Sequence, residues 1–458
     1  MKEFDLIVVG AGSGLDVASA FASQGKEVAV VEPGPLGGTC LNRGCIPSKM
    51  LIHRADIIDE IRDSERFHVD AEVQDIHFEE MVDEVNQEIH EDSQQIKQGI
   101  EQSENHTLYR TKTRFVDNET LDVSSAEAEE DRITADKIVV AAGTRPIVPP
   151  IDGVEDVDYM TSKEALELDE KPDDIVIIGG GYISAELAHF YNSMGVDITI
   201  IERNDTMLKY EDGEISEKYT EIARERFDVN TGFSAVEVEE MEDDRIGVVA
   251  EDQDSNERSF EADELLIAAG REPNTDSLEV EKTDIETDDR GYVEVNEYMQ
   301  TSVDHIYALG DIVGKHPFKH AANLEADVAL VNAFAGNRKE VDYTAMPHAI
   351  FTSPQIAGVG DTEEQLSEKG VEYRKAKYEY EKTGMGMALK EENGFVKVLA
   401  SEDGEILGCH IIGAHASQQI HEVLVAMRSG DGKVSDIQDT IHIHPALNEV
   451  VQRAFNQL

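Results

Sequence analysis

The stretch DLIVVGAGSGL, residues 5–15, decides the fold of this chain. Its apolar run from Leu6 to Val9 predicts a buried strand, and the glycines that follow predict a tight turn into a helix. A second strand is predicted at residues 27–31, just before Glu32. In such a strand–helix–strand unit, a pyrophosphate lies at the helix N-terminus and a ribose binds the carboxylate after the second strand. The third glycine of that fingerprint would fall on Leu15, so this motif alone equally allows a plain strand–turn–helix.

The same pattern recurs at residues 175–190, IVIIGGGYISAELAHF. The strand VDITIIER follows it and ends on Glu202 and Arg203. The third fingerprint position is Ser184 here, which is small enough for a helix to pack closely against a strand. Two such units, about 170 residues apart, predict two bound dinucleotides.

Glycine-ended strands are predicted at residues 138–146 and 265–274, where we expect the chain to cross between domains. A further strand at 305–311 ends on Asp311. An aspartate at a strand end is by itself an ordinary turn residue, but in a protein with two nucleotides it is predicted to bond a cofactor hydroxyl. The apolar stripe of residues 78–100 predicts a helix used for packing or for a subunit contact.

The composition is strongly acidic. The chain has 458 residues, with 97 Asp and Glu against 40 Lys and Arg, for a formal net charge of −57. This length predicts about three domains. The acidic residues are scattered among apolar segments, which favours a solvated surface screened by concentrated salt, as in halophiles, over disorder. The same charge disfavours nucleic acid as a partner. We expect no membrane association and a cytoplasmic location, since no signal peptide or spanning segment is evident.

Two of the three cysteines lie close together in GGTCLNRGC, residues 37–45. Three cysteines in a reducing compartment do not make a disulfide framework, so the pair of Cys40 and Cys45 is predicted to be catalytic or metal-binding. Cys409 lies in the apolar run ILGCHIIGA and is predicted to be an inert core residue.

The longer motif GGTCLNRGCIPSK, residues 37–49, resembles the redox-active disulfide motif of the class I pyridine nucleotide–disulfide oxidoreductases, of the glutathione and mycothione reductase type. The resemblance extends over essentially the whole chain, to ALGD and to IHIHPALNEVV near its end. It implies an α/β fold with two Rossmann-like dinucleotide-binding domains and a C-terminal α+β dimerisation domain. The domains it implies are an FAD-binding domain at 1–147, an NAD(P)H-binding domain at 148–266, a central segment at 267–336 that completes the FAD region, and a dimerisation domain at 337–458.

The resemblance also assigns roles to the two thiols. Cys45, at the start of a predicted helix, is the thiol that contacts the flavin, and the helix dipole there favours a thiolate. Cys40 is the interchange thiol that attacks the substrate. A zinc site would need further ligands at metal spacing, and none lie nearby; no metal is expected.

Four further residues are catalytic by the same resemblance. Lys49 and Glu186 correspond to an ion pair near the reactive nitrogen of the flavin, although each could otherwise be a routine helix charge. His444 and Glu449 correspond to an acid/base pair, in which the imidazole serves Cys40 and the carboxylate orients the ring. This pair is expected to reach the dithiol of the other subunit, so that the active site requires a homodimer.

The resemblance implies FAD and NADPH as cofactors. Tyr182 matches the residue whose ring covers the flavin until the nicotinamide displaces it. The residues predicted to bind the cofactors are Gly10, Gly12, Ser13, Gly14, Glu32, Gly38, Thr39, Lys49, Gly143, Asp311, Gly179, Gly181, Tyr182, Ile183, Glu202, Arg203, Lys209 and Gly270.

The sequence also allows a prediction of which coenzyme and which substrate the enzyme uses. Glu202 alone would indicate NAD, because a carboxylate repels a 2′-phosphate, but Arg203 and Lys209 at this spacing favour NADPH. The expected substrate is a low-molecular-weight disulfide, bis-γ-glutamylcystine, reduced to γ-glutamylcysteine. The alternative is a dihydrolipoamide dehydrogenase of a 2-oxoacid dehydrogenase complex. Arg43 could meet a substrate carboxylate or be a plain surface residue.

Overall fold

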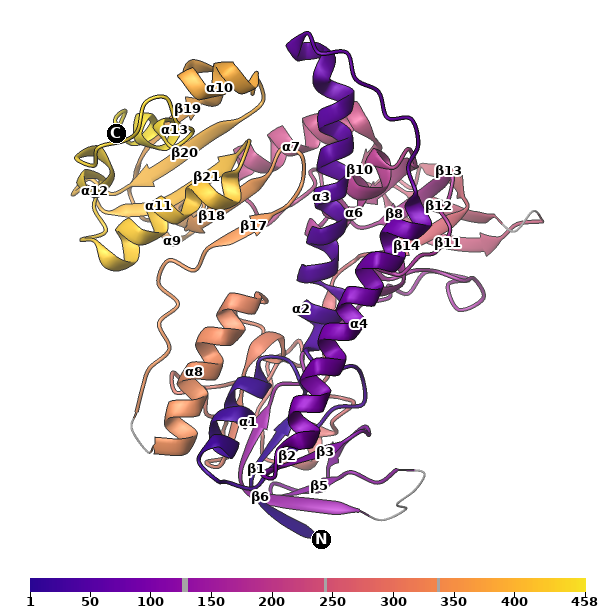
Figure 1. Ribbon diagram of the computed structural model, residues 1–458. Coiled ribbons are helices and arrows are strands. Elements are labelled where there is room, and N and C mark those ends of the chain that lie inside the picture. Colours follow the sequence, from indigo (N-terminus) through magenta and orange to yellow (C-terminus); the bar gives the residue numbers. More distant parts are fainter. Residues whose placement is uncertain (126–130, 243–244, 336–337) are drawn as a thin grey trace. The chain divides into compact units, whose positions relative to one another are not determined.

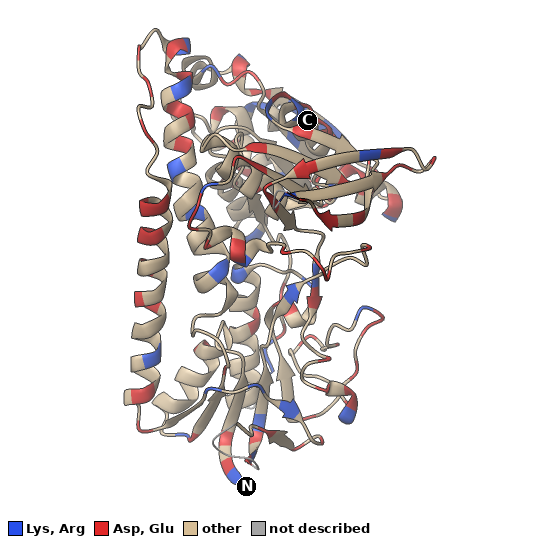
Figure 2. Cartoon of the chain, turned by 90° about the vertical axis from the view of Figure 1, so that its right-hand side faces the viewer, with Lys and Arg blue, Asp and Glu red and all other residues tan. Residues whose placement is uncertain are grey.

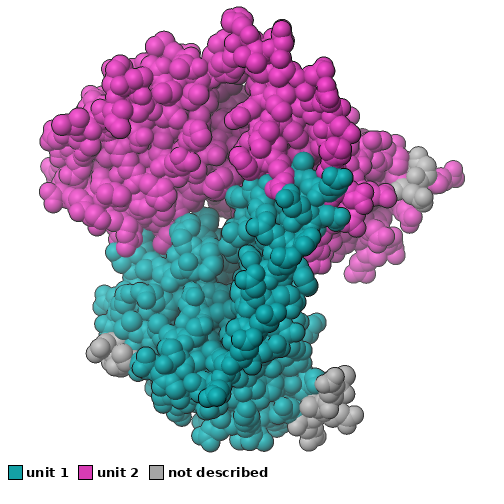
Figure 3. All heavy atoms as spheres, in the orientation of Figure 1, with its two compact units in different colours: residues 1–50, 80–147, 270–343 teal, residues 51–79, 148–269, 344–458 magenta. Residues whose placement is uncertain are grey.

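The computed structural model describes residues 1–125, 131–242, 245–335 and 338–458. They form two compact units (Figure 3). Unit 1 consists of residues 1–50, 80–147 and 270–343, and unit 2 of residues 51–79, 148–269 and 344–458. The boundary between the 267–336 and 337–458 segments falls on residues 336–337, which lie outside the described residues. The four-part division of the chain stays a prediction.

Unit 1 is built on a seven-stranded sheet with the order β3-β2-β1-β6-β5-β4, in which β16 also pairs with β6. The strands β3, β2, β1, β6 and β16 run parallel, whereas β5 and β4 are antiparallel additions. A two-stranded ladder of β7 and β15 lies outside this sheet. The strands are β1 Lys2–Val9, β2 Val28–Val31, β3 His106–Tyr109, β4 Arg114–Phe115, β5 Thr120–Asp122, β6 Arg132–Val140, β7 Thr144–Pro146, β15 Arg271–Pro273 and β16 Ile306–Ala308.

Apolar strands explain this sheet. Every residue of β2 is buried, as are the last four residues of β1 and the last three of β6, which is the pattern of a parallel sheet covered on both faces. Helices α1 and α8 pack against each other beside it (Figure 1). The helices that begin or lie in this unit are α1 Gly14–Ser23, α2 Gly38–Arg43, α3 Cys45–Arg62 and α8 Lys319–Ala335, with the short 3-10 turns η2 Val280–Lys282 and η3 Gly310–Val313.

The predicted helix at 78–100 is confirmed as α4, Phe78–Gln102. Its stripe is buried at Val82, Val85, Ile89 and Ile100. Ser93, also buried, donates a hydrogen bond to the carbonyl of Leu36 over 2.8 Å, so this helix packs beside the segment that leads into the cysteine motif.

Unit 2 contains a second parallel sheet, with the order β10-β9-β8-β14. An antiparallel sheet of β11, β12 and β13 adjoins it along the chain. The elements are α5 Ser162–Leu166, β8 Asp174–Ile178, α6 Tyr182–Ser193, β9 Asp197–Glu202, α7 Gly213–Arg226, β10 Asp228–Thr231, β11 Ser234–Glu240, β12 Ile246–Glu251, β13 Glu257–Ala262 and β14 Glu264–Ile267, with η1 Asp63–Phe67 earlier in the chain.

The C-terminal part of unit 2 is an antiparallel sheet with helices, as the predicted α+β domain requires. Its strand order is β17-β18-β21-β20-β19. Cys409 lies on β21 with no exposed surface, which confirms its predicted place in the core. The elements are β17 His348–Ile350, β18 Ile356–Gly360, α9 Glu363–Lys369, β19 Arg374–Glu379, η4 Tyr380–Lys382, α10 Gly384–Leu389, β20 Phe395–Ala400, β21 Ile406–Ile412, α11 Ala416–Ser429, α12 Val434–Gln438 and α13 Glu449–Phe455.

Acidic side chains are spread over helices, strands and loops throughout the described chain (Figure 2). They form no single tail, in agreement with the solvated surface expected from the sequence. No described helix is long and apolar enough to cross a bilayer.

The turn after β1 depends on glycine at position 10. Gly10 has φ +100°, and a Cβ there would lie 2.3 Å from the carbonyl oxygen of Ala141. Gly25 also has a positive φ, +77°, but has nothing within 4 Å of a Cβ. The two glycines therefore separate the cost of the backbone conformation from the cost of the close approach.

We expect Gly25→Ala to lower the free energy of unfolding by about 1 kcal/mol, the cost of a left-handed non-glycine residue. Gly10→Ala should cost about 1–3 kcal/mol more, since β1 and β6 must move apart to admit the methyl group. Urea unfolding of the two variants, followed by circular dichroism, measures the difference. Equal losses would contradict the close approach at Gly10.

Candidate active site

The two cysteines belong to unit 1 and lie on consecutive helices, the short α2 and the first turn of α3. Cys40 is in α2 and partly buried, and Cys45 is the exposed first residue of α3, as predicted. Gly44 separates the two helices, and a Cβ there would lie 2.9 Å from the carbonyl oxygen of Thr39. The side-chain amide of Asn42 donates to the carbonyls of Leu36 (3.0 Å) and Gly38 (2.9 Å), so the turn is braced from within.

The thiols interact with each other. The pKa of Cys40 is raised, chiefly by a hydrogen bond with the Cys45 sulfur and then by burial, while Lys319 and Lys49 oppose the rise. Cys40 therefore keeps its proton while its sulfur is hydrogen-bonded to Cys45. A base must take that proton before Cys40 can attack as a thiolate.

The cysteine turn packs directly on the first glycine turn. The N–H of Gly37 donates to the carbonyl of Ala11 over 2.8 Å. A Cβ on Gly38 would lie 2.6 Å from the Cα of Gly12. Ser13, next to Gly12, accepts a hydrogen bond from the ammonium of Lys319 (2.9 Å) and donates one to Asn323 (3.1 Å). Gly14 begins α1, so the predicted order of strand, glycine turn and helix is confirmed.

Glu32 follows β2 at the edge expected for a ribose ligand. Its carboxylate accepts hydrogen bonds from the N–H groups of Ala11 (2.9 Å) and Gly34 (2.8 Å). A carboxylate has more acceptor positions than these two bonds use. The glycine turn and Glu32 together thus form a cradle that suits a pyrophosphate and an adjoining ribose.

Asp311 lies at the end of β16, in the turn η3. Burial raises the pKa of Asp311, and its carboxylate accepts a hydrogen bond from Thr144 at 3.4 Å. In the same unit, Gly143 directly precedes β7 and Gly270 directly precedes β15. Both glycines have a positive φ, +63° and +135° respectively. These features fit the sugar-alcohol chain of FAD, which offers hydroxyl groups to a buried carboxylate.

Sequence reasoning missed two residues of this region. Glu325, on α8, is only 1% exposed, and its carboxylate accepts hydrogen bonds from the N–H of Gly310 (2.6 Å) and the hydroxyl of Tyr343 (2.7 Å). Lys319, the first residue of α8, contributes the positive charge near Cys40 already described. The signal for Glu325 was a single acid within the apolar run AANLEADVAL; Lys319 had no signal in its residue type.

The second glycine turn lies in unit 2. Gly179 has φ +108°, Gly181 caps α6, and Ser184 has no exposed surface, as its predicted packing role requires. Tyr182 and Ile183 are the first two residues of α6, and the Tyr182 side chain is 46% exposed. This is the second cradle predicted from the sequence.

Glu202, at the end of β9, is buried and bonded to its own turn. One carboxylate oxygen accepts from the N–H of Gly180, and the other accepts from the N–H (2.7 Å) and side-chain amide of Asn204. Arg203 and Lys209 are both exposed. The acid therefore braces the turn, and the two cations are open to an anionic ligand.

His444 and Glu449 are brought together in unit 2. The ring Nδ1 of His444 lies 3.0 and 3.1 Å from the two carboxylate oxygens of Glu449. The hydrogen bond to His444 lowers the pKa of Glu449, so this carboxylate stays ionised and orients the ring. The His444 side chain is 72% exposed, which leaves its other nitrogen open to a partner.

The remaining predicted residues have these places. Glu186 is buried on α6 and accepts the N–H of Phe351 at 2.9 Å. Lys49 lies on α3 of unit 1, and its predicted pairing with Glu186 stays a prediction. Thr39 is half-buried on α2, and Arg43 is exposed at the end of that helix. Among the described residues, no group of three or more His, Cys, Asp or Glu is arranged to hold a metal ion.

Comparisons with known proteins agree with this geometry. Residues 4–333 match the family model "Pyridine nucleotide-disulphide oxidoreductase", and residues 346–455 match its dimerisation domain. This chain belongs to the pyridine nucleotide–disulphide oxidoreductases. Membership implies an enzyme that uses FAD and a pyridine nucleotide, and the dimerisation domain supports a homodimer.

Named relatives span the family. Mycothione reductase of Mycobacterium tuberculosis is 35% identical over 463 residues, covering 99% of each chain. Dihydrolipoyl dehydrogenase of Staphylococcus aureus is 35% identical over 456 residues, covering 99% of this chain and 96% of that protein. The solved structure of a Cu(II) complex of the flavoprotein disulfide reductase RclA from Escherichia coli matches with a TM-score of 0.88 and 26% identity, covering 100% of both chains.

The residues present fit FAD as this oxidoreductase's cofactor. The glycine cradle, which a Cβ at position 38 would fill, would hold the pyrophosphate, and Glu32 would hold the adenosine ribose. Asp311 would hold the sugar-alcohol chain. Cys45 would stand on the flavin side of the dithiol.

Glu325 gives this oxidoreductase a titrating group near neutral pH. Burial raises the pKa of Glu325 from 4.5 to about 7, against the opposing hydrogen bonds from Tyr343 and Gly310. A folded-state pKa above the unfolded value stabilises the fold fully below pH 4.5, and this stabilisation is lost as pH rises to 7. Relative to pH 4, the loss above pH 7 is at most about 3 kcal/mol.

We therefore expect Glu325→Gln to remove this part of the pH dependence, because the amide does not ionise. Its single carbonyl oxygen can still accept the N–H of Gly310, and its NH2 group can donate to the hydroxyl oxygen of Tyr343. The free energy of unfolding of the variant minus that of the parent should rise between pH 5 and pH 8. Chemical unfolding at the two pH values measures this difference, in which the other carboxylates cancel. A pH-independent difference would contradict the buried, proton-holding state of Glu325.

Proposed function

We propose that this chain reduces a low-molecular-weight disulfide with NADPH, and that bis-γ-glutamylcystine is the substrate and γ-glutamylcysteine the product. The observation that carries the proposal is the hydrogen-bonded pair of Cys40 and Cys45, held on the first nucleotide cradle. The acidic composition and the mycothione reductase relative support our proposal of a place among the haloarchaeal bis-γ-glutamylcystine reductases. The reaction needs a cytoplasmic supply of NADPH, so we place the enzyme in the cytoplasm.

The chemistry begins with proton removal at Cys40. In the homodimer, His444 of the partner subunit would take the Cys40 proton, with the ring held by the carboxylate of Glu449. The Cys40 thiolate attacks one sulfur of the substrate disulfide; a mixed disulfide forms, the substrate S–S bond breaks, and the first thiolate leaves. His444 returns the proton to this leaving thiolate.

Cys45 completes the cycle on the protein side. Its thiolate attacks the Cys40 sulfur of the mixed disulfide, which releases the second product thiolate and closes the Cys40–Cys45 disulfide. A proton from solvent neutralises that second thiolate. Bound FAD would supply the two electrons that reopen the disulfide, drawn from the hydride of NADPH. The sum is NADPH, one proton and one disulfide giving NADP⁺ and two thiols.

NADPH is favoured by the surroundings of Glu202. Both of its oxygens accept hydrogen bonds from the turn, and Arg203 and Lys209 are exposed beside it. Two cations suit a 2′-phosphate, which carries about two negative charges at neutral pH. Tyr182, at the start of α6, would move aside for the nicotinamide.

The second candidate function is dihydrolipoamide dehydrogenase with NAD. The shared CIPSK motif, the acid at position 202 and the relative from Staphylococcus aureus favour it. Side-by-side assays of the FAD-loaded protein, with NADPH plus bis-γ-glutamylcystine and with NAD plus dihydrolipoamide, decide between them. Faster turnover in the second assay would replace the first proposal. A purified protein that takes up no FAD would exclude both.

Replacing the two active-site thiols one at a time should give two different phenotypes. Cys40→Ser should lower disulfide reduction by at least about a thousandfold, because the attacking sulfur is gone. It should keep the long-wavelength absorbance of a thiolate beside oxidised flavin. Cys45→Ser should lose both the turnover and this absorbance. Absorption spectra and NADPH-oxidation assays of the FAD-loaded variants measure the two effects.

Cys409→Ala is the matched control, since it removes the buried third thiol and should change neither the absorbance nor the turnover by more than about twofold. The reverse phenotypes for the two active-site variants would show that the sulfurs have been assigned the wrong way round.

A further inference from the structure

The segment between β9 and α7 carries both exposed cations of the second nucleotide cradle. We call residues 203–211 the coenzyme loop. Near its middle, Leu208 adopts a left-handed backbone conformation with φ +55°. Such a conformation costs a bulky residue about 1–2 kcal/mol, so its surroundings must hold it in place.

Two hydrogen bonds to neighbouring elements, together with burial, hold Leu208. Its N–H donates to the carbonyl of Gly180 over 2.8 Å, which ties the coenzyme loop to the glycine turn. Its carbonyl accepts the hydroxyl of Ser216, on α7, over 2.8 Å. Its side chain is 5% exposed. The position of Lys209, the next residue, therefore depends on where α7 begins.

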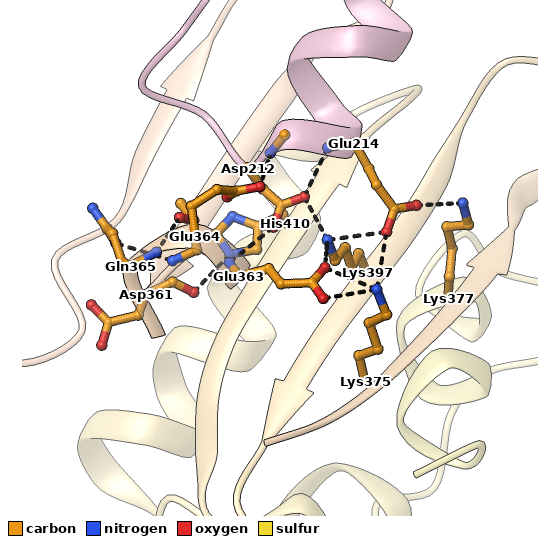
Figure 4. Close-up of polar contacts among 12 residues, drawn as sticks. Asp212, Glu214, Asp361, Glu363, Glu364, Gln365, Lys375, Lys377, Lys397 and His410 are labelled. Atoms are coloured by element: carbon orange, nitrogen blue, oxygen red, sulfur yellow. Dashed lines mark hydrogen bonds and ion pairs between the residues drawn. The ribbon is translucent and has the colours of Figure 1, made fainter. Parts of the chain in front are cut away.

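The start of α7 is fixed by a buried charge cluster (Figure 4). Asp212 has no exposed surface, and as the N-cap of α7 it accepts the N–H of Glu214 at 3.2 Å. The same oxygen accepts a hydrogen bond from the ammonium of Lys397, on β20, at 2.8 Å. The other oxygen of Asp212 accepts the N–H of Glu363, at the start of α9, at 3.2 Å.

Lys397 is the centre of this cluster. It is 1% exposed, and its ammonium also lies 2.6 Å from the carboxylate of Glu363 and 3.1 Å from that of Glu214. Burial alone would lower the pKa of Lys397, but the hydrogen bonds to Asp212 and Glu363 outweigh it and raise the pKa. The lysine thus stays charged, and its removal would leave Asp212 buried without its counter-ion.

Neighbouring residues reinforce the same attachment. Glu211, the last residue of the coenzyme loop, lies 2.7 Å from the ring Nε2 of His348, on β17. The N–H of Gly213 donates to the carboxylate of Glu364 at 3.2 Å. Three consecutive residues, 211–213, are therefore bound to the C-terminal sheet and its helix α9, while Leu208, near the middle of the coenzyme loop, is bound to the glycine turn.

We propose that Lys397 is a positioning residue for coenzyme recognition, which fixes Asp212 at the start of α7 and thereby holds Leu208 and Lys209 where Lys209 can meet the 2′-phosphate of the coenzyme. The inference rests on the proposed use of NADPH. It adds a residue about 190 positions from Lys209 in the sequence, in a different sheet, to the determinants of coenzyme choice.

Lys375 supplies a matched control. Its ammonium lies 2.8 Å from the carboxylate of Glu363, the same acid that Lys397 contacts. Its side chain is 51% exposed, and its ammonium also lies 3.9 Å from the carboxylate of Glu214. Lys375→Met and Lys397→Met therefore each remove one positive charge from Glu363 and from Glu214, but only the second removes the ammonium that is bonded to Asp212, the N-cap of α7.

The experiment measures binding of 2′,5′-ADP and of 5′-AMP to the FAD-loaded protein by titration calorimetry. These probes carry and lack the 2′-phosphate, and neither can reduce the flavin. We expect Lys397→Met to weaken the binding of 2′,5′-ADP by at least about tenfold, because a charge-assisted contact is lost. The binding of 5′-AMP should weaken by less than about threefold. Lys375→Met should change both by less than about twofold.

A second variant guards against misfolding of Lys397→Met, which the thermal unfolding midpoint would reveal. Asp212→Asn keeps the N-cap oxygen but removes the charge that Lys397 holds. We expect this variant to weaken the binding of 2′,5′-ADP by at least about threefold more than the binding of 5′-AMP. Unchanged binding in the folded variants, or equal loss of both probes, would overturn the positioning role and leave the proposed function intact. If the unaltered protein binds 2′,5′-ADP no more tightly than 5′-AMP, the use of NADPH itself is wrong, and this inference falls with it.

Discussion

The whole site depends on one close approach between two stretches of backbone. The cysteine turn lies on the glycine turn so closely that a Cβ on Gly38 would come within 2.6 Å of the Cα of Gly12. The hydrogen bond from Gly37 to Ala11 fixes the same approach. Any side chain in this contact would separate the two cysteines from the glycine turn after β1. The short distance between the two backbones thus requires glycine beside Cys40, and the proposed electron transfer would need the thiols beside a cofactor held at this turn.

Two deeply buried ionisable groups of this acidic chain differ in their charge state: Lys397 stays charged, whereas Glu325 tends to keep its proton. Lys397 is surrounded by carboxylates, so it remains ionised although it has almost no exposed surface. Glu325 is buried as deeply, but its partners are neutral donors, Gly310 and Tyr343. Among the residues that the structure describes, no cation is bonded to it to offset its loss of hydration, so its pKa rises toward neutrality. The partner's charge, and not the depth of burial, decides which form the buried group takes.

The local elements of the fold were accessible from the sequence. The strand at Leu6–Val9, the helix at 78–100 and the core position of Cys409 were all predicted and are confirmed. Glu325 and Lys397 were not found. Each is a charged residue within an apolar segment, and a periodic pattern can only identify such a residue as an exception. The sequence pattern does not show which residue the buried charge will contact. Lys397, for example, bonds to Asp212, which is 185 positions away.

By itself the sequence determined the two strand–turn–helix units, the closely spaced cysteine pair and the family. Runs of β-branched residues, glycines at tight turns and the spacing of Cys40 and Cys45 act over a few residues, so they can be read in chain order. Only the tertiary structure decided which charges are buried together, and hence that Lys397 holds the start of α7 and that Glu325 titrates near neutral pH. The energy of a charge depends on the water it loses and the groups that replace that water, and folding brings those groups from distant parts of the chain.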